Sequence, residues 1–84
     1  MYLTIRHNYK VIGIINNLTE KNTVLDLKNT ICKNYGFTVE QQIIIFYNIL
    51  LKDEKMLIDY NIIEKSKDIK NFCTCYQMDL LTKI

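Results

Sequence analysis

The chain has 84 residues, of which 49% are hydrophobic, and a formal net charge of +2 at pH 7. This length suits one domain with one hydrophobic core, while the composition excludes a disordered chain and the lack of any apolar run of about 18 residues excludes a membrane-spanning helix. Lys and Arg alternate with acidic residues instead of forming one basic stripe, so we expect no nucleic-acid binding.

The first residues, 1–6, alternate between apolar and polar types, which predicts a half-buried strand and does not fit a signal peptide. A β-branched run at 11–15 follows the polar residues 7–10, and the two runs predict a β-hairpin. Gly13 lies inside the second run and indicates a bulge there, which leaves the inward-facing residues of that strand open.

The clearest helix signal covers residues 24–35. Thr23 is suited to the N-cap, and Asp26 stands three residues later in a capping-box position. Val24, Leu27 and Ile31 recur on one face of the predicted helix. The helix should end before Gly36, which is able to adopt the left-handed conformation.

Residues 43–47 form an unbroken apolar run rich in β-branched and aromatic side chains, which predicts a strand with apolar residues on both faces. A turn at Asn48 and a short strand at 49–51 should follow, then a charged loop at 52–55. We expect the last strand within 69–76. The predicted order is strand, strand, helix, strand, short strand and strand.

This order and the residues that carry it resemble the ubiquitin family. The matching residues have almost constant spacing and are Thr23, Leu27, Lys28, Ile31, Gly36, Gln41, Gln42, Ile45, Phe46, Leu51, Asp53, Leu57, Asp59, Tyr60, Asn61 and Ile62. Met1, Leu3 and Ile5 also fit the first strand of the family, and the resemblance fades after Ile62.

The resemblance implies an α+β fold of the ubiquitin-like β-grasp kind, a mixed sheet of four to five strands packed on one helix. We expect the domain to cover 1–78, with 79–84 as a C-terminal tail, ordered or disordered. It further implies that Tyr60 bonds through its hydroxyl to nearby backbone and that Lys28 is partly buried. The expected core is Leu3, Ile5, Val24, Leu27, Ile31, Ile44, Leu51, Leu57 and Ile62.

Catalytic chemistry is not indicated. His7 lies in a predicted turn, and local spacing sets no carboxylate or thiol beside it, so we expect a solvated histidine and no enzyme activity. Cys32, Cys73 and Cys75 are an odd number without a signal peptide, which favours reduced, buried thiols in the cytoplasm, the nucleus or both. We expect no metal and no cofactor.

Two departures from the family bear on covalent attachment. Conjugated relatives end in Gly-Gly, whereas this sequence has no glycine after Gly36. At the two lysine positions that ubiquitin uses most for chain building, it has Ile49 and Glu64. We therefore expect no conjugation through this C-terminus.

With conjugation not expected, the role that the resemblance still implies is recognition of partner proteins through a surface. With Ile44 turned inward, Ile43, Ile45 and Tyr47 should face outward, and in ubiquitin the isoleucine that matches Ile45 is the centre of a patch that partners bind. If the last strand has Ile69 inward, then Lys70 and Phe72 join this face, and Tyr9 borders it. The predicted partner-binding residues are Ile43, Ile45, Tyr47, Lys70, Phe72 and Tyr9.

Two alternatives concern the same face. The segment after Phe72, with Met78, Leu80 and Leu81, would bury it by folding back, or two copies of the chain would pair through it.

The function that we expect is a non-catalytic protein–protein interaction module with partners such as components of the ubiquitin pathway, the proteasome or an unfoldase. The alternatives are a protein modifier with an atypical C-terminus and a structural subunit of a larger assembly.

Overall fold

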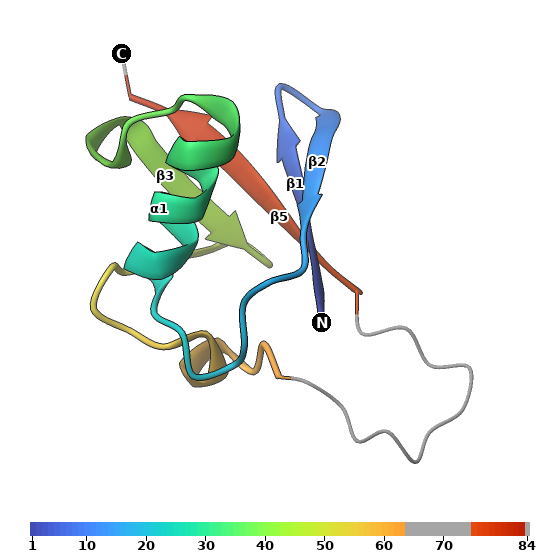
Figure 1. Ribbon diagram of the computed structural model, residues 1–84, viewed down its shortest axis with the longest axis vertical. Helices are drawn as coiled ribbons and strands as arrows, with labels where there is room; N and C mark the ends of the chain where they lie inside the picture. The colour runs from blue at the N-terminus through green and yellow to red at the C-terminus, as the bar shows by residue number, and fades with distance from the viewer. Residues whose placement is uncertain (64–74, 84) are drawn as a thin grey trace.

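The computed structural model describes residues 1–63 and 75–83, in which the helix α1 packs on one face of a five-stranded mixed sheet (Figure 1). The sheet order is β2-β1-β5-β3-β4, with β1 and β5 parallel and the other neighbours antiparallel. This confirms the expected α+β class. The elements are β1 (Tyr2–His7), β2 (Lys10–Ile15), α1 (Val24–Tyr35), the 3-10 turn η1 (Val39–Gln41), β3 (Gln42–Phe46), β4 (Ile49–Leu50), the 3-10 turn η2 (Leu57–Tyr60) and β5 (Cys75–Thr82).

The hairpin of β1 and β2 contains the bulge that Gly13 indicated. Ile5 pairs with Gly13 and Arg6 with Val11, so Ile12 has no partner on β1. The Tyr35 ring from α1 lies directly on Gly13, where a Cβ atom would overlap its hydroxyl. Glycine at this position therefore lets the end of the helix approach the strand closely.

Helix α1 begins and ends where its capping residues predict. The Asp26 amide donates to Thr23 Oγ1 at 3.1 Å, while Asp26 Oδ2 accepts from the Thr23 amide at 2.9 Å. Gly36 has a φ of 83°, and its amide donates to the Cys32 carbonyl at 2.9 Å. Each contact satisfies a backbone group that the helix itself leaves unpaired.

The core lies between α1 and the sheet. All nine residues that the sequence places there are buried. Inward residues of β3 and β5, together with Ile15 and Leu18, complete the core. The buried apolar residues are Leu3, Ile5, Ile15, Leu18, Val24, Leu27, Ile31, Ile44, Phe46, Leu51, Leu57, Ile62, Met78 and Leu80.

The last strand corrects the sequence prediction. It was expected within 69–76, of which 69–74 lie outside the described residues, but β5 covers Cys75–Thr82 and lies between β1 and β3. The expected boundary at residue 78 therefore falls inside a strand, and 79–82 belong to the sheet. The reason is that Met78 and Leu80, two residues apart as the inward-facing residues of a strand are, have fully buried side chains. A strand that ended at residue 76 would have left both of these apolar side chains in a tail.

Two tyrosine hydroxyls fix the irregular segments around this sheet. Tyr60 accepts from the Lys52 amide at 2.9 Å, which confirms the expected bond to nearby backbone. Tyr76 donates to the Ile63 carbonyl at 2.8 Å and accepts from the Ile63 amide at 3.3 Å. The second pair joins the start of β5 to the segment that follows η2.

Buried polar contacts attach α1 to its surroundings. Lys28 is 8% exposed, in accord with the expected partial burial, and its Nζ lies 2.6 Å from Asp53 Oδ1. The Gln42 amide nitrogen donates to the carbonyls of Lys28 at 2.8 Å and Phe37 at 2.9 Å. Because these contacts join α1 to β3 and to the 52–55 loop, they set the position of the helix along the sheet.

The helix cap makes stability depend on pH. The pKa of the Asp26 carboxyl lies below its ordinary value because the Thr23 backbone amide, and then the Asn22 side-chain amide, donate to the carboxylate. A carboxyl whose pKa is lower in the folded state stabilises that state above its unfolded pKa, and the stabilisation is lost as the pH falls through the folded pKa.

We therefore expect Asp26→Asn to lower the free energy of unfolding by about 0.5–1 kcal/mol at neutral pH, a typical range for an N-terminal cap. The difference from the wild type should shrink as the pH falls below about 4, near the unfolded pKa of an aspartate. Urea denaturation of both proteins between pH 2 and 7 measures it. A difference that stays constant over this range would contradict the assignment.

Candidate protein-binding surface

The face of the sheet turned away from α1, here called the outer face, carries an apolar patch on its β3–β5 side. Since Ile44, Met78 and Leu80 point into the core, the residues between and beside them point outward. Strand pairing sets Ile43 beside Leu81 and Ile45 beside Leu50. We call these four residues, Ile43, Ile45, Leu50 and Leu81, the β3–β5 patch.

The structure brings part of the sequence-predicted surface together. Ile43 and Ile45 are half-buried and face outward as expected, while Tyr47 is 83% exposed in the turn after β3 and Tyr9 is 92% exposed in the turn after β1. Lys70 and Phe72 lie outside the described residues. The role of these residues in binding stays a prediction.

The alternative that the segment after Phe72 folds back over the outer face has a different outcome for its different residues. Met78 and Leu80 do not fold back over the outer face, because both point to the other side of β5 and are buried in the core. Leu81 does reach the outer face, where it extends the patch as part of the sheet. The sequence reasoning therefore missed Leu50, Leu81 and Asp79 as surface residues, although the alternation along 76–82 carried the signal for the last two.

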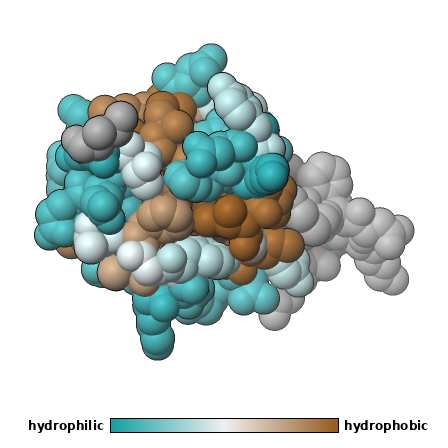
Figure 2. Space-filling view, turned by 90° about the horizontal axis from the view of Figure 1, so that it is seen from above, coloured by the Kyte–Doolittle hydropathy of each residue, from teal (hydrophilic) through white to brown (hydrophobic). Residues whose placement is uncertain are grey.

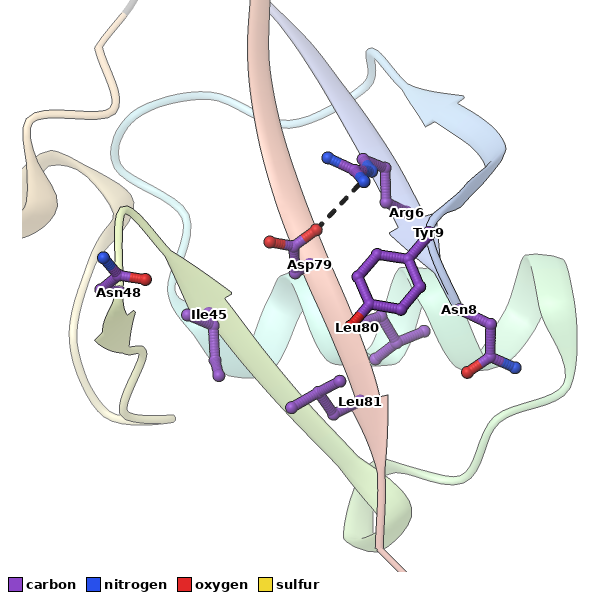
Figure 3. Close-up of a pocket in the computed structure, with 8 residues that line it drawn as sticks. All are labelled: Arg6, Asn8, Tyr9, Ile45, Asn48, Asp79, Leu80 and Leu81. Carbon is purple, nitrogen blue, oxygen red and sulfur yellow. Dashed lines mark ion pairs between the residues drawn. The ribbon is translucent and has the colours of Figure 1, made fainter.

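A groove of about 460 Å³ runs along the outer face beside the patch (Figure 3). Figure 3 looks onto this face with α1 behind the sheet, and shows the Tyr9 ring beside β5, between Asp79 and Asn8. The view of Figure 2, from the side of the β1–β2 turn, shows apolar surface bordered by hydrophilic groups. The groove is lined by Arg6, Asn8, Tyr9, Ile45, Asn48, Asp79, Leu80 and Leu81.

One charged pair stands in the middle of the outer face. Asp79 pairs with Arg6 across β1 and with Ile45 across β3, and its Oδ1 lies 3.8 Å from Arg6 Nε. With its amide oxygen turned toward Arg6, Gln77 accepts from Nε at 3.0 Å and from Nη1 at 2.7 Å. The guanidinium thus has a closer partner in Gln77 than in Asp79.

Both ends of the groove are formed by two-residue hairpin turns with unusual sequences. Asn8 and Tyr9 have φ of 52° and 64°, and Tyr47 and Asn48 have φ of 48° and 63°. Positive φ at both central residues defines the type I′ turn, in which Asn and Gly are common and bulky residues are strained. A tyrosine nevertheless occupies one position of each turn.

Catalytic or metal chemistry gains no support from the described residues. His7 ends β1 and is half-buried, with its ring 4.9 Å from that of Phe37, so the expected solvated turn histidine is wrong. Residues 1–63 and 75–83 contain no group of three or more His, Cys, Asp or Glu side chains placed to hold a metal ion. In the same residues, no helix has the length and apolar character needed to cross a bilayer.

The fold and its outer face agree with a comparison of the sequence with protein families. The model of the ubiquitin family matches residues 3–68. The chain belongs to the ubiquitin family. Domains of this family are generally not enzymes. The comparison with curated proteins gives no match.

The family match covers one part of this domain and leaves its last strand outside. It covers the hairpin, α1, β3 and β4, and it ends at residue 68, before β5 begins at Cys75. The part of the surface contributed by Asp79 and Leu81 therefore lies beyond the matched residues, which explains why the resemblance alone did not reveal it.

The strained turn gives a test. Tyr9→Gly should raise the free energy of unfolding by about 1 kcal/mol, because glycine adopts positive φ without the steric cost that tyrosine has there. Tyr2→Gly, which removes a partly exposed tyrosine from an ordinary strand position, should instead lower it. Chemical denaturation of the two variants measures both changes. A Tyr9→Gly protein as destabilised as Tyr2→Gly would contradict the assigned strain.

Proposed function

We propose that the chain is a non-catalytic protein-binding module of the ubiquitin family that docks a partner protein on the β3–β5 patch. The observation that carries the proposal is the placement of Ile43, Ile45, Leu50 and Leu81 as neighbours on the sheet face opposite the helix. Leu50 and Leu81 are 57% and 46% exposed.

An apolar patch of this kind supports binding for two reasons. Neighbouring exposed aliphatic side chains have an unfavourable contact with water that a partner would remove. Tyr9 and Tyr47 stand at the two turns that border the patch, and tyrosine is among the residues that supply most energy at interface centres. A rigid sheet also changes little on docking, so the entropic cost of ordering is small.

The resemblance guides the choice of partner class. Ile45 matches the isoleucine at the centre of the ubiquitin patch, so partners from the ubiquitin pathway, the proteasome or an unfoldase are proposed, in the cytoplasm, the nucleus or both. A homodimer through the same face, a subunit of a fixed assembly and a modifier with an atypical C-terminus are the alternatives.

The test compares the same substitution at an isoleucine inside the β3–β5 patch and at one outside it. Ile45→Asp introduces a charge into the patch, whereas Ile58→Asp introduces it on η2, outside the sheet, at a side chain that is 40% exposed. A protein captured from cell extract by the wild-type chain is purified, and its affinity for the three proteins is measured by calorimetry. We expect Ile45→Asp to weaken binding by about 30-fold, the size of a hot-spot loss, and Ile58→Asp to leave it unchanged.

Thermal unfolding of each variant shows that the fold is retained. Equal affinity of the wild type and Ile45→Asp would contradict the proposed surface, as would a loss confined to Ile58→Asp. Sedimentation of the chain alone separates the alternatives, since a dimer broken by Ile45→Asp would indicate pairing of two copies.

A further inference from the structure

The groove beside the β3–β5 patch is lined by a carboxylate, an aromatic ring and aliphatic side chains. Asp79 and Tyr9 line it together with Ile45 and Leu81. We infer that this groove selects a partner segment in which an arginine or lysine side chain stands among apolar residues. The inference rests on the proposed function and adds the chemistry that the partner must bring.

The Asp79 carboxylate is free to accept a stronger ionic partner than the one it has. Its side chain is 58% exposed, and Arg6 Nε approaches its Oδ1 at 3.8 Å. An exposed pair at this distance is weak, and the closer contacts of the guanidinium are with Gln77. A direct, charge-assisted hydrogen bond from a partner cation would be shorter and stronger.

Arg6 does not occupy the place that the partner cation would take. Figure 3 shows its guanidinium approaching Asp79 from above the Tyr9 ring, on the side of Asp79 away from Leu81. The other lining residues, including Asn8 and Asn48, bring no positive charge, and their amide oxygens are further acceptors. The side of Asp79 that faces Leu81 therefore favours a cation and disfavours an anion.

Tyr9 adds the second attractive group. Its ring is 92% exposed and stands beside Asp79 in the groove, where its face is open to a cation. The backbone that carries it is held at a φ of 64°, a conformation that glycine would adopt without strain. Strain retained at an exposed aromatic residue is typical of a functional position.

The apolar floor makes the selection specific. Ile45 and Leu81 offer contact to the methylene groups of an arginine or lysine while its charged end reaches Asp79. An acidic side chain in the same place would be repelled by the Asp79 carboxylate, and a neutral one would leave that carboxylate with the weak 3.8 Å pairing to Arg6. Discrimination thus comes from repulsion as well as attraction.

The experiment uses three heptapeptides, acetylated and amidated, of the sequence Ser-Leu-Leu-X-Leu-Leu-Ser, in which X is arginine, norleucine or glutamate. Each is titrated into the ¹⁵N-labelled full chain and followed by NMR. We expect the arginine peptide to bind about tenfold more tightly than the norleucine peptide and the glutamate peptide to bind most weakly. The shifted amides should include Tyr9, Ile45, Asp79 and Leu81.

Three variants test which residues cause the preference for the arginine peptide. Asp79→Asn should reduce the arginine-to-norleucine ratio to about threefold or less while norleucine binding is retained, and Tyr9→Gly should reduce the ratio in the same direction without loss of fold. Glu40→Gln removes an exposed carboxylate on η1, outside the groove lining, and should leave the ratio unchanged.

The outcomes separate the two proposals. Equal binding of the arginine and norleucine peptides would overturn cation selection and leave the docking surface standing. Failure of all three peptides to shift outer-face amides would overturn the docking surface as well. An unchanged ratio in Asp79→Asn would show that the cation is not recognised by the groove.

Discussion

The position of β5 between β1 and β3 is the constraint on which the rest of the structure depends. β5 pairs in parallel with β1 and antiparallel with β3, so its register is fixed from both sides. Met78 and Leu80 then enter the core, and the period of two along a strand leaves Asp79 and Leu81 no direction except outward. A shift by one residue would bury a carboxylate and expose two core side chains, which makes this register strongly preferred.

The same constraint assembles the proposed binding surface from distant parts of the chain. Leu81 completes the patch that Ile43 and Ile45 begin, and Asp79 sets a negative charge in the middle of it. The hairpin turns contribute Tyr9 and Asn48 at the borders of the groove. The affinity proposed for the patch and the selectivity proposed for the groove thus both arise from side chains that meet only through strand pairing.

Local signals explain why the first two thirds of the fold could be predicted from sequence. The capping box at Thr23, the glycine at Gly36 and the inward positions of α1 are set by neighbours a few residues away, and the structure confirms all of them. The last strand could not be predicted, because several stretches after Ile62 have strand-like composition and only long-range pairing selects Cys75–Thr82. The groove was missed for the same reason.

The central claim is that Asp79 lies on β5 between Arg6 and Ile45, and interproton contacts measured by NMR on the full chain test it most directly. The account predicts nuclear Overhauser effects from the backbone protons of Asp79 to those of both Arg6 and Ile45. Contacts that pair β1 and β3 with residues in 69–74, and none to Asp79, would contradict the register, the outer face and the groove together.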